Sequence, residues 1–213
     1  MMIFAFLLAA MNLLPNGNFD QGGKSPLNWE RPNGLTTFIV QEEGRGNVVK
    51  LDSRLDRQQV LDFLKELKSN PEATPPAPIL AKAPFYSSIG GNEGVQYDSE
   101  LIAVKPGQNY KLTIDVKGNS KPFVWIKGFR KHPRRDVLID SYQTRLHAEP
   151  LDEKQWQTFS IGFNPTAKSP NTELMKVRIY VYWPVGICYF DNVRIEEISK
   201  EEMEELVKQR SEQ

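Results

Sequence analysis

The chain has 213 residues, which suits one globular domain with an insertion or with tails. Lysine plus arginine and aspartate plus glutamate both number 27, so the zero formal charge excludes a global field that would attract nucleic acid or an anionic membrane. The single cysteine, Cys188, excludes an internal disulfide, and its apolar, strand-like surroundings predict a small buried core residue.

A short apolar run, IFAFLLAA, occupies residues 3–10. It is too short to span a bilayer, which takes about 20 apolar residues. With the small residues Ala9 and Ala10 it favours a signal peptide over residues 1–11, and we expect a protein that is secreted or held in the cell envelope (periplasm or cell surface). Because no Lys or Arg precedes Lys24, a first strand or a frayed apolar terminus is the alternative.

The segment that follows combines tight turns with short strands. Residues 15–17, Pro-Asn-Gly, form a turn, and further turns are expected at 32–34 and 44–46. Residues 47–51 alternate weakly between apolar and polar side chains and predict a strand.

Residues 54–84 interrupt this strand-rich pattern. Apolar residues there recur at helical spacing, and Asn70-Pro71 ends the predicted helix. The members of this apolar stripe are Val60, Leu61, Phe63, Leu64 and Leu67. A Pro-rich strap follows, so we expect a surface insertion of a helix and an extended strap, its stripe docked on the domain or presented to a partner.

From residue 85 the strand pattern returns. Apolar and polar residues alternate over 110–117, and further strands are expected within 121–131, 136–146, 154–165 and 175–198. Short strands separated by turns indicate an all-β fold, a two-layer antiparallel β-sandwich or a barrel. The charged segment 199–213 predicts a short C-terminal helix.

Several stretches occur together in a familiar order: NLLPNGNFDQG at 12–22, Trp29, VKPGQNYKLTIDVKG at 104–118, WQTFSIGF at 156–163 and YFDNVRIEE at 189–197. This set resembles the CenC-type carbohydrate-binding modules, which belong to the galactose-binding-domain-like jelly rolls. The resemblance covers residues 12–198 apart from the 54–84 insertion. It implies a jelly-roll β-sandwich and binding of a polysaccharide or oligosaccharide.

The resemblance also implies that the first and last strands lie side by side and hold a structural Ca²⁺. Carried over by position, Asp20 matches the usual glutamate of the first motif and Asp191 matches the aspartate of the last. Calcium takes six to eight oxygen ligands, the remainder being backbone carbonyls near 47–50. The alternative is that Asp20 caps a turn while Asp191 accepts backbone hydrogen bonds at a bulge.

Sugar-binding sandwiches stack aromatic rings on the apolar faces of pyranoses, while polar side chains bind the hydroxyls. In KVRIYVYW the residues Arg178, Tyr180 and Tyr182 share the face opposite the predicted core, so they are the main candidates for an aromatic groove. Trp125 is a further candidate, although either side of its strand could face the core, and Tyr97 is a weaker one. Core packing is the alternative role for any single ring.

The basic run at 127–135 is either a solvated hairpin tip or a surface for an acidic polysaccharide or phosphate. No nucleophile, zinc-protease, phosphate-loop or dinucleotide motif occurs, so no catalysis is expected, and no nucleic-acid partner is indicated. The sequence thus predicts a non-catalytic, exported carbohydrate-binding β-sandwich. A structural or protein-interaction sandwich of the cell envelope, without sugar binding, is the alternative.

Overall fold

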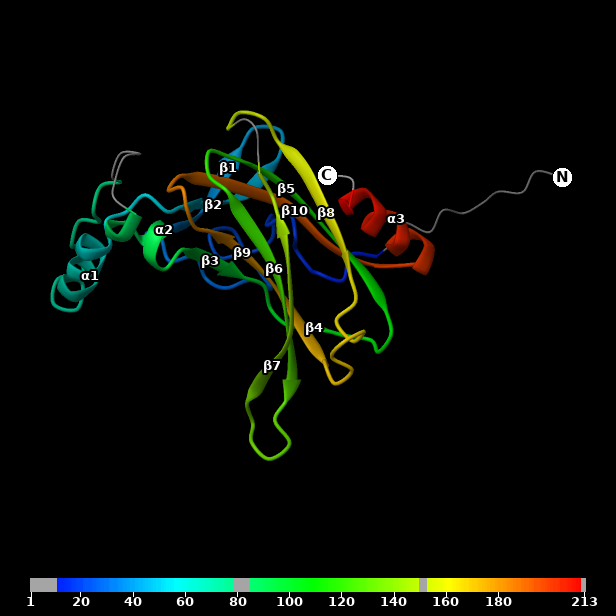
Figure 1. Cartoon of the computed structure of the whole chain (residues 1–213). Helices are drawn as coiled ribbons and strands as arrows, with labels where there is room; N and C mark the ends of the chain where they lie inside the picture. The colour runs from blue at the N-terminus through cyan, green and yellow to red at the C-terminus, as the bar shows by residue number, and fades with distance from the viewer. Residues whose placement is uncertain (1–10, 79–84, 150–152, 212–213) are drawn as a thin grey trace.

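The computed structural model describes residues 11–78, 85–149 and 153–211. The predicted signal peptide lies outside this part except for Met11, as does the end of the predicted strap, 79–84. The strands form two antiparallel sheets that face each other, as the ribbon shows (Figure 1). The predicted all-β, two-layer β-sandwich of the jelly-roll type is therefore confirmed.

Sheet I has the strand order β1-β2-β10-β5-β8, and sheet II has the order β3-β9-β6-β7, with β4 paired to β9. The strands of sheet I are β1 (Thr37–Glu42), β2 (Gly46–Asp52), β10 (Ile187–Ile198), β5 (Asn109–Gly118) and β8 (Gln157–Phe163). Those of sheet II are β3 (Val95–Asp98), β9 (Leu174–Val181), β6 (Pro122–Lys131), β7 (Leu138–His147) and β4 (Ile102–Ala103). The helices are α1 (Arg57–Glu66), the 3-10 turn η1 (Phe85–Ser87), α2 (Ile89–Asn92) and α3 (Lys200–Ser211).

The core lies between the sheets because each central strand alternates apolar and polar residues with period two. On β5, Leu112, Ile114 and Val116 are fully buried, while the intervening side chains are only partly covered. Cys188 is also fully buried as predicted, and burial raises the pKa of its thiol to about 12. A buried aliphatic side chain of this size contributes about 1.5–3 kcal/mol relative to exposure, so these alternating strands supply much of the stability.

The two ends of the domain meet, as the sequence predicts. The Leu13 amide donates to the Ile195 carbonyl at 2.7 Å, and the Val193 amide donates to the Gly17 carbonyl at 2.8 Å. The Asn12 side chain adds two bonds, donating to Val193 and accepting from the Ile195 amide. The early segment runs antiparallel to β10 without being a regular strand, so it ties the start of the domain to its last strand.

The turn after residue 15 serves this docking. A Cβ on Gly17 would lie 1.8 Å from the Val193 carbonyl oxygen, so the close approach to β10 requires glycine. Phe19 follows with φ of 58° and is fully buried, with its ring centroid 4.8 Å from that of Trp29. Trp29 in turn stacks on Tyr97 at 5.5 Å. The turn therefore places the Phe19 ring in the core.

The helix predicted within the insertion is present as α1. Its N-cap, Asp56, accepts a hydrogen bond from the Gln59 amide at 3.0 Å, which satisfies one of the unpaired donors at the helix start. Val60 is buried, as a docked stripe requires. The leucines of the stripe are instead exposed by 42%, 46% and 38%: Leu61, Leu64 and Leu67. Docking of the whole stripe on the domain is therefore wrong.

The predicted C-terminal helix is present as α3 and packs on sheet I beside β8 (Figure 1). A Cβ on Gly162 would lie 2.6 Å from the Met203 sulfur, so the helix sits close to that strand. Lys111 of β5 forms an ion pair with Glu202 at 3.3 Å. Among the described residues, no helix has the length and apolar character needed to cross a membrane.

Candidate functional site on sheet II

The outer side of β9 carries the three main candidates. Val177, Ile179 and Val181 point into the core and are at most 1% exposed. Arg178, Tyr180 and Tyr182 therefore lie on the opposite side and are half-buried, as the alternation predicts.

β6 lies beside β9, and the burial of its residues shows which side of this strand faces outward. Val124 and Ile126 are buried in the core, so Trp125 and Phe123 point to the outer face. In the register of the two strands, Phe123 lies opposite Tyr180 and Trp125 lies opposite Arg178. The sheet thus brings Trp125 next to the candidates on β9.

Four rings form a row across three strands, which we call the aromatic row: Tyr182, Tyr180, Phe123 and His147. Tyr182 stacks on Tyr180 with centroids 6.1 Å apart, and Tyr180 stacks on Phe123 at 6.4 Å. His147, on β7, meets Phe123 edge-on at 4.9 Å. Aromatic pairs at these separations are worth about 0.5–1.5 kcal/mol beyond their area burial, so they hold one another in place.

Arg145 of β7 lies over two of the outer rings. Its guanidinium carbon is 5.1 Å from the Phe123 centroid and 5.1 Å from the Trp125 centroid, both within cation–π range. The side chain is exposed, and no carboxylate within the described part of the chain pairs with it. The aromatic row is therefore bordered by an unneutralised positive charge.

Arg178, in contrast, is held by a carboxylate. Asp98 of β3 accepts two hydrogen bonds from its guanidinium at 2.7 and 2.8 Å and also pairs with Lys176. Burial alone would raise the pKa of Asp98, but the hydrogen bonds and charges of Arg178 and Lys176 hold that pKa below its usual value. The Asp98 side chain is 1% exposed, and it fixes the position of Arg178 from the neighbouring strand.

Tyr180 is positioned by the end of α2. Its hydroxyl donates to the Glu93 carbonyl at 2.9 Å. The next residue, Gly94, has a φ of 74°, and a Cβ there would lie 2.2 Å from the tyrosine ring. Glycine therefore allows the chain to pass close to this ring.

Tyr97 does not belong to this face. It is 1% exposed and stacks on Trp29, and burial raises the pKa of its hydroxyl above the ordinary value. A ring at that position cannot touch a ligand without opening the core. The proposal that Tyr97 contacts a ligand is therefore wrong, because β3 turns this residue inward.

The two carboxylates predicted to hold calcium both contact the hairpin between β1 and β2. Asp20 accepts hydrogen bonds from the Asn47 amide at 2.9 Å and from the Asn18 side chain at 2.8 Å. Asp191 accepts from its neighbour Asn192 at 2.7 Å and from Arg45 at 3.0 Å. Asp191 also lies at a β-bulge in the pairing of β10 with β5. This is the position expected if Asp191 accepts backbone hydrogen bonds instead of binding calcium.

This donor set does not suit Ca²⁺ as it stands. All four carboxylate oxygens of Asp20 and Asp191 already accept protein hydrogen bonds, and the cation beside Asp191 is the guanidinium of Arg45. Within residues 11–78, 85–149 and 153–211, no cluster of three or more His, Cys, Asp or Glu is placed to hold a metal ion. Calcium binding by this pair stays a prediction.

Sequence reasoning missed part of the face: Phe123, Arg145, His147, Asp98 and Lys176. Phe123 could have been found, because it lies two residues before Trp125 and so shares its side of the strand. Arg145 could not, since its place depends on the pairing of β7 with β6, which a bulge shifts after Gly128.

No family model and no curated protein matches the sequence. Solved structures do share the fold. A cyclase from Fischerella sp. TAU is similar with a TM-score of 0.52 and 16% identity, over 89% of this chain and 98% of that chain. The arabinose-bound MgGH51 α-L-arabinofuranosidase has a TM-score of 0.52 and 11% identity, over 90% of this chain and 27% of that chain.

Carbohydrate-binding modules are also among the similar structures. Family 16 Carbohydrate Binding Module-2 has a TM-score of 0.46 and 13% identity, over 83% of this chain and 98% of the module. Identities this low show the fold alone, and the fold occurs in a cyclase as well as in an α-L-arabinofuranosidase. Membership of the CenC-type family therefore stays a prediction, and function must be argued from the face itself.

Proposed function

We propose that the protein binds a polysaccharide or oligosaccharide, without cleaving it, on the outer face of sheet II. The observation that carries the proposal is the aromatic row of Tyr182, Tyr180, Phe123 and His147, with Trp125 beside it. These residues stand on paired strands or directly after one, and they lie on the side of sheet II that faces away from the core.

Flat rings on a rigid sheet suit a sugar chain for two reasons. The apolar face of a pyranose covers an aromatic ring with little loss of side-chain entropy, since Phe and Trp have only two side-chain torsions. The pairing of β9 with β6 and β7 fixes the spacing of the rings before a ligand arrives, so little ordering is needed on binding.

The test is a glycan array, followed by affinity measurements on the strongest glycan found. Trp125→Ala should weaken binding about fivefold, since one stacked ring contributes on the order of 1 kcal/mol. The matched control is Trp156→Ala. Trp156 is half-buried, lies beneath the guanidinium of Arg45 and belongs to the outer face of sheet I, so its loss should leave binding unchanged.

A second pair of variants checks the row itself. Tyr180→Ala with Tyr182→Ala should abolish binding, whereas Tyr180→Phe keeps the ring and should retain it. Circular dichroism establishes that each variant is folded. Equal losses from Trp125→Ala and Trp156→Ala, or an array without any bound glycan, would refute the proposal.

The alternative is a structural or protein-interaction module of the cell envelope, and the exposed leucines of α1 and its C-cap favour it: Leu61, Leu64 and Leu67. A folded wild-type protein that binds no glycan would decide for this alternative. Export remains part of the proposal because of the apolar run at 3–10. It is tested by recovering the protein outside the cytoplasm and measuring its molecular mass, which should show removal of residues 1–11.

A further inference from the structure

Charge on the candidate face is unevenly balanced. Four cations stand on the outer side of β6, β7 and β9, namely Lys127, Arg145, Lys176 and Arg178. Two carboxylates form ion pairs with them, Asp98 and Asp140. Asp98 is shared between two of the cations, and Asp140 meets Lys127 at 3.5 Å. Of these four cations, Arg145 is therefore the one without an ion pair to a described carboxylate.

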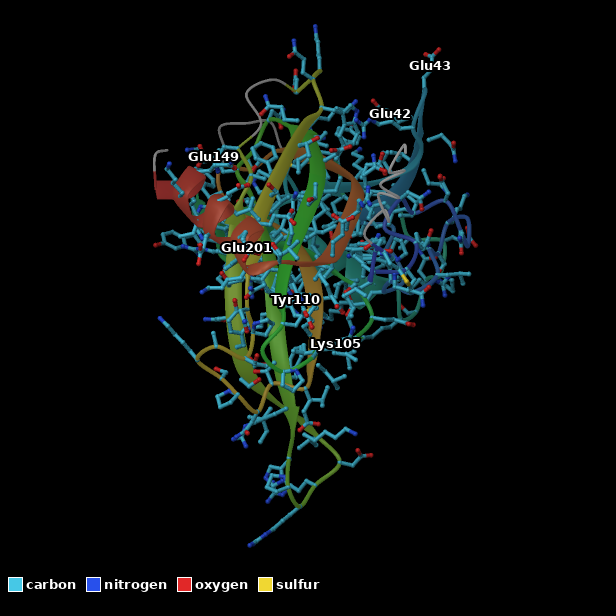
Figure 2. All side chains as sticks on the ribbon, turned by 90° about the vertical axis from the view of Figure 1, so that its right-hand side faces the viewer. Glu42, Glu43, Lys105, Tyr110, Glu149 and Glu201 are labelled. Carbon is cyan, nitrogen blue, oxygen red and sulfur yellow. The ribbon has the colours of Figure 1, made fainter. Side chains whose placement is uncertain are left out.

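The β6–β7 hairpin carries further cations. It projects beyond the rest of the molecule in both views (Figures 1 and 2). Its cations have no ion pair to a described carboxylate: Arg130, Lys131, Arg134 and Arg135. Asp136 is the acidic residue at the tip, and the turn is closed by the Arg134 amide donating to the His132 ring at 3.0 Å.

Rings and cations lie on the same path. The ten residues of β6 span about 33 Å, from the aromatic row to the hairpin tip. Arg145 lies over Phe123 and Trp125, so a sugar bound along this row would bring its substituents next to the guanidinium. The planar fork of arginine binds a carboxylate or a sulfate through two hydrogen bonds, which a neutral hydroxyl cannot match.

We propose that the ligand of this face is an acidic glycan, a sugar chain that carries carboxylate or sulfate groups, with Arg145 as the residue that binds the anion. This rests on the proposed glycan binding and narrows it to a class of ligand. Arg178 and Lys176 share Asp98 and contribute less, because their charge is already partly balanced.

Three matched pairs of polysaccharide test the charge: polygalacturonate and its methyl ester, glucuronoxylan and arabinoxylan, and dextran sulfate and dextran. The charged member of at least one pair should bind at least about fivefold more tightly than its neutral partner, and added salt should reduce this preference. A preference confined to dextran sulfate identifies the group as sulfate, and one confined to the other two pairs identifies it as carboxylate.

Arg145→Gln should remove that preference, with about fivefold weaker binding of the charged member and little change for the neutral one. The matched control is Lys50→Gln. Lys50 is a cation 5.3 Å over the ring of Phe38 on sheet I, and it has no ion pair among the described residues. Lys50→Gln therefore removes the same charge as Arg145→Gln, but away from the outer face of sheet II.

Neutral and charged members that bind equally, or equal effects of Arg145→Gln and Lys50→Gln, would overturn the acidic-glycan assignment. In that event Trp125→Ala would still weaken binding, and the proposed function would stand. Failure of every array glycan to bind would instead remove the proposed function, so the two failures are distinguishable.

Discussion

The two outer faces of the sandwich carry the same pair of groups in different electrostatic states. On sheet I, the Arg45 guanidinium lies 4.1 Å over Trp156 and bonds to Asp115 at 2.8 Å and to Asp191 at 3.0 Å. On sheet II, Arg145 lies 5.1 Å over Trp125, and the described chain offers it no carboxylate. A cation stacked on an indole therefore does not by itself mark a binding site.

The difference lies in what surrounds each cation. Sheet I is crossed by further ion pairs, including Glu42 with Lys117, and α3 covers part of its outer face near β8. Figure 2 shows Glu42 and Glu43 at the far end of the β1–β2 hairpin, and the Trp156 indole donates to Glu42 at 3.3 Å. The charges around Trp156 are paired within the fold, whereas Arg145 is left to interact with a ligand.

The largest expected effect is on stability, from removal of the two arginines. Arg45→Ala leaves the buried carboxylate of Asp191 without its cation and should lower the free energy of unfolding by about 3 kcal/mol. Arg145→Ala removes an exposed side chain without an ion pair and should cost less than about 1 kcal/mol. Urea unfolding followed by fluorescence measures both free energies. Equal losses of stability in the two variants would contradict the proposed difference between the faces.

The second prediction concerns how tightly Tyr180 is held. Gly94→Ala puts a Cβ 2.2 Å from the tyrosine ring, so it should displace that ring and weaken glycan binding several-fold. Gly107→Ala is the control, because Gly107 has nearly the same φ, 75° against 74°, and a Cβ there meets nothing within 4 Å. Gly107→Ala should lose about 1–2 kcal/mol of stability from backbone strain, and Gly94→Ala should lose more because of the clash with the ring.

Calorimetric titration with the array glycan separates the two glycine variants. Weakened binding in Gly94→Ala alone would show that Tyr180 must keep its position. The same affinity in both variants would contradict a role for this ring in binding.

Acid should act on Asp98 and Asp191 in opposite directions. The Asp98 pKa is held low by Arg178 and Lys176 despite burial, whereas burial raises the Asp191 pKa in spite of Arg45. Ionised Asp98 therefore adds stability above about pH 4, and this is lost as the pH falls through its lowered pKa. Asp191 adds stability when it takes up a proton, as the pH falls through its raised pKa, and loses it as the pH rises.

The pH dependence of the urea midpoint between pH 6 and 2.5 measures this. Asp98→Asn should reduce the loss of stability in acid, and Asp191→Asn should make this loss steeper. Each change in the free energy of unfolding should be smaller than that expected for Arg45→Ala. Parallel profiles for the two variants would contradict the assignment of the two pKa directions.

Periodicity predicted β9 correctly because the strand is long and one side of it is wholly apolar. On β6 both sides carry large apolar or aromatic residues, so only packing could decide that Val124 and Ile126 face the core. Tyr97 was misassigned because β3 has only four residues, too few for alternation to show a side. Arg145 depends on strand pairing across a bulge, which no local pattern encodes.

The smallest expected effect concerns calcium, and it tests whether Arg45 takes the place of a metal ion on sheet I. Calcium at a hundredfold excess over its dissociation constant would stabilise the fold by about 2.7 kcal/mol. Because Arg45 already supplies the cation beside Asp191, we expect the melting temperature to be the same in millimolar Ca²⁺ and in EDTA. A rise of several degrees with Ca²⁺ in the wild type, abolished in Asp20→Asn, would show that the metal displaces the guanidinium. The same rise in Arg45→Ala alone would show that the two cations compete for one carboxylate, and the contrast between the faces would then depend on the calcium concentration.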